Sequence, residues 1–154
     1  MIRKATFDDI ESIEDTYNEH FKYEIEYGAF TVFKNGIYPT SKDAEKAVSA
    51  GTLYVYEEDS NIAGSIIVDN TQPIEYEEIF GGQNYTNDEA MIIHLLMVRP
   101  SMAEKGISSS LIRYAEELAR NHSCKVLRLD TGKQNIPALS LYKNWAFKVL
   151  QRLL

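Results

Sequence analysis

The 154-residue chain has little cysteine, no apolar run of membrane-spanning length and no excess of basic residues. Its single cysteine, Cys124, excludes an internal disulfide framework and is compatible with a reducing cytoplasm. No uncharged apolar run approaches the roughly 20 residues of a transmembrane helix. No N-terminal segment reads as a signal peptide, because charged residues bracket only short apolar pieces. We therefore expect a cytoplasmic protein that does not enter a membrane.

The net charge of −7 disfavours nonspecific nucleic-acid binding, which depends on clustered lysine and arginine. It mildly favours the approach of a cationic amine. The glycine fingerprints of Rossmann and P-loop proteins are absent. The histidines are too scattered along the chain to indicate a metal site; they are His20, His94 and His122. We therefore expect neither a nucleic-acid partner nor a metal.

The length and the ordinary apolar and charged fractions, 44% and 25%, predict one globular domain over residues 1–154. Residue patterns predict strands over residues 2–5, 53–56, 62–68, 90–98, 126–129 and 147–154. They predict helices that begin near Ile10, Ser41, Ile107 and Ile136. Residues 21–38 lose the helical pattern and are interpreted as a loop or irregular helix. A long polar loop over residues 69–89 is interpreted as functional or mobile.

The most informative stretch is the apolar strand that ends at Val98, followed by Pro100 and a helix that begins near Gly106. This order directs the unpaired amides and positive dipole end of a helix toward the end of the strand. Such a site suits an anion, and phosphate above all.

Two motifs resemble those of the GCN5-related N-acetyltransferase (GNAT) family. Val98-Arg99-Pro100 and the following loop resemble its acyl-CoA motif, and residues 135–147 resemble its Asn-x-x-Ala-x-x-x-Tyr-x-x-x-Gly-Phe motif. The resemblance implies an α/β (α+β) fold with a mixed, mostly antiparallel central sheet flanked by helices. It also implies that the sheet is splayed between the fourth and fifth strands. The family's last strand is absent from the predicted pattern, because the chain ends at Leu154.

The implied activity is direct transfer of the acetyl group of acetyl-CoA, as co-substrate, to a primary amine of a small molecule or peptide. In the family the pantetheine arm of CoA lies beside the splayed strand and its pyrophosphate lies on the loop amides. The cofactor-binding residues implied here are Leu96, Met97, Val98, Lys105, Gly106, Ile107, Ser108, Ser109 and Asn135. The hydroxyl of Tyr142 would protonate the leaving thiolate; alternatively, Tyr142 packs in the core.

Two residues compete for the role of general base. His94 is an ionisable group inside the central strand, and histidine titrates near neutrality. It is alternatively a buried, hydrogen-bonded residue that shapes the pocket. Glu89, just before the strand, would act through water.

The acceptor pocket is predicted to lie between residues 21–38 and the loop over residues 69–89. The carboxylates there either attract a cation or form a solvated acidic surface; they are Glu24, Glu26, Glu75, Glu77 and Glu78.

The phosphate loop departs from the family pattern. Ala103 replaces Gln or Arg, Glu104 replaces the common first Gly, and Ser108 replaces the last Gly or Ala. Together with Ala146, which stands where Gly usually ends a helix, these changes predict weakened CoA binding. The alternative function is a non-catalytic CoA-binding or interaction module, and a third reading is a truncated, unstable paralogue. The missing last strand predicts a homodimer, or a swapped element, around residues 149–154.

Overall fold

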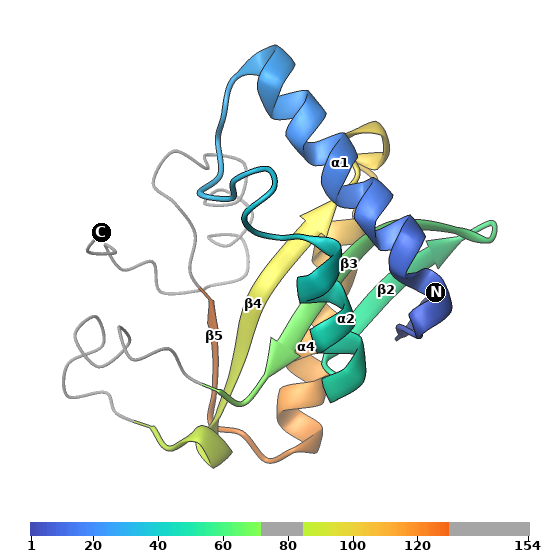
Figure 1. Ribbon diagram of the computed structural model, residues 1–154. Helices are drawn as coiled ribbons and strands as arrows, with labels where there is room; N and C mark the ends of the chain where they lie inside the picture. Colours follow the sequence, from blue (N-terminus) through green and yellow to red (C-terminus); the bar gives the residue numbers. More distant parts are fainter. Residues whose placement is uncertain (72–84, 130–154) are drawn as a thin grey trace.

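A five-stranded sheet with strand order β1-β2-β3-β4-β5 organises the structure, a computed structural model that describes residues 1–71 and 85–129. Neighbouring strands are antiparallel except β4 and β5, which run parallel (Figure 1). The strands are β1 (Ile2–Lys4), β2 (Leu53–Glu58), β3 (Asn61–Asp69), β4 (Ala90–Val98) and β5 (Val126–Leu129). The helices are α1 (Ile10–Tyr27), α2 (Ser41–Ala50) and α4 (Ile107–Asn121).

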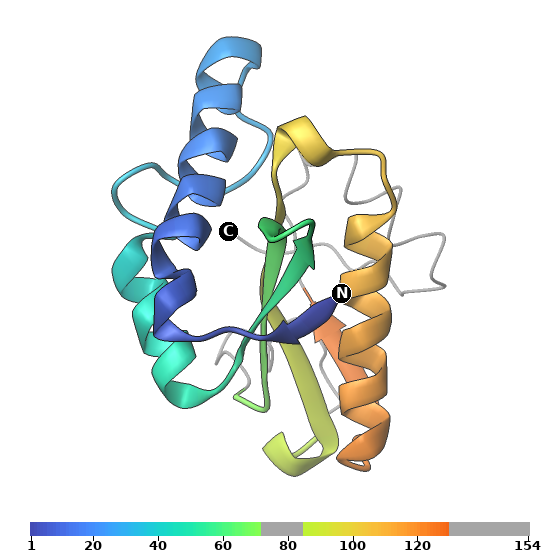
Figure 2. The same cartoon turned by 90° about the vertical axis from the view of Figure 1, so that its right-hand side faces the viewer.

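The helices cover both faces of the sheet, with α1 and α2 on one face and α4 on the other (Figure 2). The first face packs Ile13 and Tyr17 of α1 against Leu95 and Met97 of β4. The second face packs apolar residues of α4 against β3 and β4. A mixed, mostly antiparallel sheet between helices is the predicted architecture, and it is confirmed. None of the described helices has the length and apolar character needed to cross a membrane.

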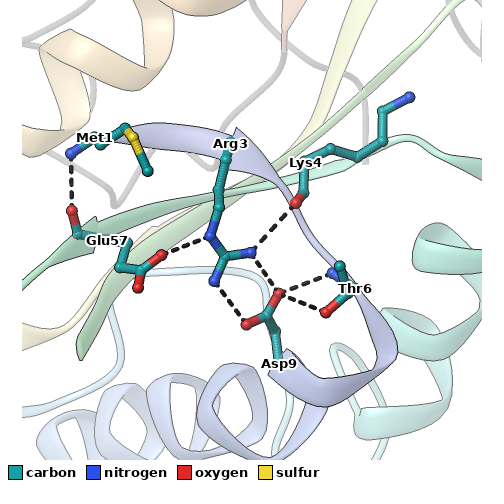
Figure 3. A network of polar contacts seen from close by, with 6 residues as sticks. All are labelled: Met1, Arg3, Lys4, Thr6, Asp9 and Glu57. Atoms are coloured by element: carbon teal, nitrogen blue, oxygen red, sulfur yellow. Dashed lines mark hydrogen bonds and ion pairs between the residues drawn. The ribbon is translucent and has the colours of Figure 1, made fainter. Parts of the chain in front are cut away.

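A polar network at the N-terminus joins β1, the start of α1 and β2 (Figure 3). The Arg3 guanidinium donates to both carboxylate oxygens of Asp9 at 2.8 and 2.9 Å and to Glu57 at 2.5 Å. Asp9 also accepts from the Thr6 amide at 2.8 Å, which completes a capping box. These bonds hold the pKa of Asp9 below its ordinary value, the Arg3 bond most strongly. The network determines where α1 begins relative to the sheet.

The α1 helix is longer than the sequence pattern predicts. Residues 21–27, interpreted as a loop or irregular helix, continue α1 to Tyr27, and Gly28 ends it with a φ of 99°. Glu24 explains the extension, because its buried carboxylate accepts the amides of Phe30 and Thr31 at 2.8 and 2.9 Å. This bond pair holds the chain after α1 against its last turns. Glu24 is therefore neither part of a solvated acidic surface nor free to attract a cation, the two alternatives that the sequence left open.

The remaining helix and strand predictions agree with the structure within the described residues. The α2 helix begins after a capping box formed by Thr40 and Asp43 and ends at Gly51, which has a left-handed φ of 72°. The β2–β3 hairpin turns at Asp59 and Ser60. The predicted helix near Ile136 and the predicted strand over residues 147–154 lie outside the described residues, as does the question of the family's last strand.

Candidate functional site

A β-bulge interrupts the central strand β4 at His94. Leu95 pairs with Ile67 of β3 and Ile93 pairs with Val68, so His94 is an extra residue between two consecutive pairs. Side chains alternate between faces in a regular strand, and a bulge interrupts that alternation. His94 and Leu95 consequently lie on the same face, the one covered by α1 and α2. The bulge therefore displays an imidazole where a regular strand would have turned one of these residues away.

The pairing of β4 with β5 stops at the same point. The two strands pair from Ala90 with Val126 to Ile93 with Leu129. Within residues 1–71 and 85–129, no strand pairs with Leu95–Val98 on that side. Figure 1 shows β4 and β5 beginning side by side and diverging toward the C-terminal end of β4. This divergence agrees with the splay expected between the fourth and fifth strands.

His94 has an acidic partner that the sequence analysis missed. Its Nε2 lies 2.5 Å from Oδ1 of Asp69, the last residue of β3, and the two side chains are 24% and 28% exposed. The Thr71 amide donates to the same carboxylate oxygen at 2.8 Å. Burial raises the pKa of Asp69, but the bonds from His94 and Thr71 outweigh it and leave this pKa below its ordinary value. The site thus pairs an imidazole with an ionised carboxylate.

The turn after Asp69 is fixed to the start of β4. The side-chain amide of Asn70 donates to the carbonyl of Ala90 at 2.8 Å and to that of Asn87 at 3.2 Å. These bonds join Asn70 to residues that follow it by 20 and 17 positions in the sequence. Asp69 therefore sits on a braced turn.

Glu89, the second candidate base, is engaged elsewhere. Lys125 donates to its carboxylate at 2.6 Å, and the amide and hydroxyl of Thr86 donate at 3.0 and 3.1 Å. The Lys125 bond, followed by those of Thr86, lowers the pKa of Glu89 to about 2. A carboxylate with so low a pKa accepts protons poorly at neutral pH. These surroundings favour His94 over Glu89 as the base.

The loop after β4 ends in free amides, as the sequence predicts. The first backbone bond of α4 runs from the Ser110 amide to the Gly106 carbonyl at 3.1 Å, so the amides of residues 107–109 precede the helical ladder. Gly106 caps the helix with a φ of 77°, and a side chain added there would meet nothing within 4 Å. Open space beside free amides at a helix N-terminus fits a diphosphate.

Glu104 occupies this loop in an unusual conformation. Its φ is 65°, in the left-handed region that glycine adopts most easily. The residue is exposed, and Lys105 beside it is exposed as well. Arg99 does not pair with Glu104, because its guanidinium is bound by Glu19 of α1, by the carbonyl of Ser12 and by that of Ile62.

The phosphate loop is attached to α1 through Glu19. This carboxylate accepts the amide and the hydroxyl of Ser101 at 2.8 and 2.7 Å and approaches Arg99 at 3.5 Å. Burial raises the pKa of Glu19, but the Ser101 and Arg99 contacts lower it further than burial raises it. The loop therefore has a fixed position relative to the helix that covers the His94 face.

The other expected site residues divide into two groups. Leu96 and Val98 pack toward α4 and Met97 toward α1, so only their backbone groups remain for the open side of β4. Asn135 and Tyr142 lie outside the described residues. In the described parts of the chain, no three His, Cys, Asp or Glu side chains gather as metal ligands would, and a metal-free reaction stays a prediction.

Comparisons with known proteins match the chain to acetyltransferases. The model of the acetyltransferase (GNAT) family matches residues 10–147. A putative acetyltransferase from Staphylococcus aureus has 24% identity and a TM-score of 0.73, covering 94% of this chain and 89% of its own. A GNAT-family acetyltransferase from Listeria monocytogenes has 20% identity and a TM-score of 0.75, covering 96% and 86%.

A third solved structure contains a bound coenzyme. The PaiA N-acetyltransferase from Thermoplasma acidophilum, in complex with coenzyme A, has 16% identity and a TM-score of 0.73, covering 97% of this chain and 89% of its own. A search of curated protein sequences found no match.

Proposed function

Because the chain belongs to the GNAT acetyltransferase family and is an acyltransferase, we propose that it moves the acetyl group of acetyl-CoA directly to a primary amine of a small molecule or peptide. Acetyl-CoA is the co-substrate in this proposal. A similar fold binds coenzyme A in the Thermoplasma protein, which supports this choice.

One observation carries the proposal: the open edge of β4 begins at the bulge and ends at the free amides of α4. Pairing with β5 stops at Ile93, and Val98 leads through Pro100 to Gly106. A slender thioester arm lies along Leu96–Val98 like an added strand, with backbone groups of these residues bonding its amides. Its diphosphate rests on the amides of residues 105–109, and the Lys105 ammonium lies close by. Asn135 bonds the arm as well.

Acetyl transfer makes three chemical demands on the site. The attacking amine must be neutral, the tetrahedral oxyanion needs a hydrogen-bond donor, and the departing thiolate needs a proton. His94 takes the proton of the amine, directly or through a water. A main-chain N–H near Leu96 donates to the oxyanion. The Tyr142 hydroxyl protonates the thiolate.

Two measurements test the proposal. Calorimetric titration with acetyl-CoA measures binding, and thiol release is then followed against a panel of small aliphatic amines, aminoglycosides and peptides with a free N-terminus or lysine. Transfer to at least one amine, identified by a mass gain of one acetyl group, is the expected result. Tyr142→Phe should lower kcat with little change in CoA affinity. An equal loss of both would assign Tyr142 to packing.

Glu104 favours a second candidate function, a non-catalytic CoA-binding module. A carboxylate in a diphosphate loop weakens the site, and its left-handed φ of 65° adds conformational strain. CoA binding without turnover on any amine would support this candidate over the enzyme.

Three further expectations stay predictions. Residues 1–154 form one domain, the protein is cytoplasmic, and it dimerises through residues 149–154. Light scattering at high micromolar concentration tests the dimer, which a monomeric mass would contradict.

A further inference from the structure

We propose that Asp69 is a positioning residue for His94 and that Nδ1 of His94 is the atom that accepts the proton of the amine. This inference rests on the proposed acetyl transfer and deepens it, because it names the acidic partner of the base and the reacting nitrogen. It depends on the 2.5 Å contact between His94 Nε2 and Asp69 Oδ1, on the bulge, and on the braced turn after β3.

The two side chains meet because of the strand register. Asp69 pairs with Ile92, and paired residues of neighbouring strands share a face. His94 follows Ile92 by two positions and lies on that same face. The bulge then lets the imidazole reach across to the end of β3. In a regular β4, His94 would lie directly opposite Ile67; with the extra residue it lies between the Ile67–Leu95 and Val68–Ile93 pairs, nearer to Asp69.

The chemistry of the contact decides which ring nitrogen carries the proton. An ionised carboxylate only accepts hydrogen bonds, so Nε2 must donate, and the proton of the neutral ring sits there. The other nitrogen, Nδ1, then keeps its lone pair. The amide of Thr71 donates to the same carboxylate oxygen at 2.8 Å and helps to keep Asp69 ionised. The carboxylate therefore selects a single tautomer.

The neighbouring charges do not offer a competing partner. Among the described residues, Asp69 is the titratable group that contacts His94. Glu89 lies near the start of β4 but pairs with Lys125 and Thr86. The α1 residues His20 and Glu24 pair with each other at 3.0 Å. The imidazolium formed in the reaction is thus stabilised by Asp69.

The proposed step balances. The nitrogen of the neutral amine attacks the acetyl carbonyl carbon, a C–N bond forms, and the C–S bond of the thioester breaks. One proton moves from the nitrogen to His94 Nδ1, while the thiolate takes one proton from Tyr142. The imidazolium then returns its proton through solvent as Tyr142 regains one. The carboxylate of Asp69 keeps its charge throughout and holds the Nε2 proton by a hydrogen bond.

Asp69→Asn is the sharpest test of this role. Nε2 and the Thr71 amide both contact Oδ1, so the new amide oxygen can accept both bonds. The variant thus keeps the turn and the tautomer and removes only the negative charge that stabilises the imidazolium. We expect kcat to fall by about tenfold or more, because the imidazolium keeps a hydrogen bond but loses its ion pair, with KM for both substrates changed less than about threefold. Asp69→Glu should restore part of kcat.

Two further variants complete the design. Asp59→Asn makes the same chemical change at an exposed turn residue and should leave kcat and the pH profile unchanged. His94→Ala removes the base and should lose more activity than Asp69→Asn, and the double variant should lose no more than His94→Ala, because Asp69 acts through His94. Wild-type kcat in Asp69→Asn, or full activity in His94→Ala, would overturn the inference while leaving acetyl transfer in place.

The tautomer is also measured without any turnover. Two-dimensional ¹⁵N–¹H spectra of ¹⁵N-histidine-labelled protein distinguish the nitrogen that bears hydrogen from the one that does not. We expect the His94 proton on Nε2 in the wild type and in Asp69→Asn, whose amide oxygen still accepts it, and a mixture of the two tautomers in Asp69→Ala. A wild-type ring protonated on Nδ1 would refute the inference even if no acceptor amine is found. If the wild-type ring is protonated on Nε2 but no amine is acetylated, the proposed function is contradicted and the inference about Asp69 is not.

Discussion

Replacing Glu104 by glycine changes both the conformational strain and the charge of the phosphate loop. Glu104 has a φ of 65° and stands two positions before Gly106, whose φ is 77°. The family pattern has glycine in its place, and the backbone here takes the conformation that such a glycine would take. The side chain is exposed, so its removal opens no cavity.

The backbone strain at Glu104 affects the free energy of unfolding, whereas its charge affects the affinity for CoA. A left-handed conformation costs a non-glycine residue roughly 1–2 kcal/mol, and glycine loses roughly 0.5–1 kcal/mol more backbone entropy on folding. Glu104→Gly should therefore raise the free energy of unfolding by between zero and about 1.5 kcal/mol. Two unit charges about 8 Å apart in water repel by about 0.5 kcal/mol. A diphosphate with two charges is then bound about fivefold more weakly because of Glu104.

Three variants separate these contributions. Glu104→Gln removes the charge and keeps the strain, so the Kd for CoA should fall about three- to fivefold at low salt with unchanged stability. Glu104→Gly should show the same gain in affinity and the added stability. Ser60→Gly relieves a similar φ of 64° in the β2–β3 turn and should change stability only. Calorimetric titration with CoA and urea unfolding of each variant provide the two readouts.

The result that would refute this reasoning is specific. If Glu104→Gln binds CoA as the wild type does at low ionic strength, no diphosphate lies near residue 104. If Ser60→Gly tightens CoA binding as much as Glu104→Gly does, the gain comes from general stability instead of from the loop.

Three other predictions concern stability. Gly64→Ala would place a Cβ 2.9 Å from the Met97 carbonyl oxygen, so urea unfolding should show a loss of about 1–3 kcal/mol, and wild-type stability would contradict this close approach. Glu24→Gln weakens the buried acceptor of the Thr31 amide and should lower the free energy of unfolding by about 1–3 kcal/mol in thermal or urea unfolding. Burial lowers the pKa of His20 more than Glu24 raises it, so the unfolded chain binds the proton more readily. Stability should therefore fall as pH drops below about 6.5, and a His20→Gln protein whose urea midpoint falls as steeply between pH 7 and 5.5 would refute this assignment.

The sequence predicts the local structure well where a signal lies within a few residues. The capping boxes at Thr6 and Thr40 each need an acidic residue three positions on. The β4 strand is apolar on both faces because it is central. The α1 helix was predicted too short, because Glu24 is an acceptor for amides six and seven positions later and not a surface charge.

The candidate site could be predicted only in part. A glycine before an amphipathic helix predicts an anion site at residues 106–109. His94 is a candidate because it is an ionisable residue in an apolar strand. Asp69 gave no such signal, because it begins a long polar loop and its partner is 25 positions away. The pairing of Asp69 with Ile92 and the extra residue in β4 bring the two together.

The sequence by itself determined the family, the order of the elements and the loop that carries free amides, because these depend on local periodicity and short motifs. The tertiary structure decided the partner of His94, the attachment of Ser101 to Glu19 and the point at which β4 and β5 diverge. The physical reason is that strand register and bulges are set by packing across the whole sheet. A one-residue insertion in a strand leaves no mark in local residue pattern, yet it decides which side chains can react together.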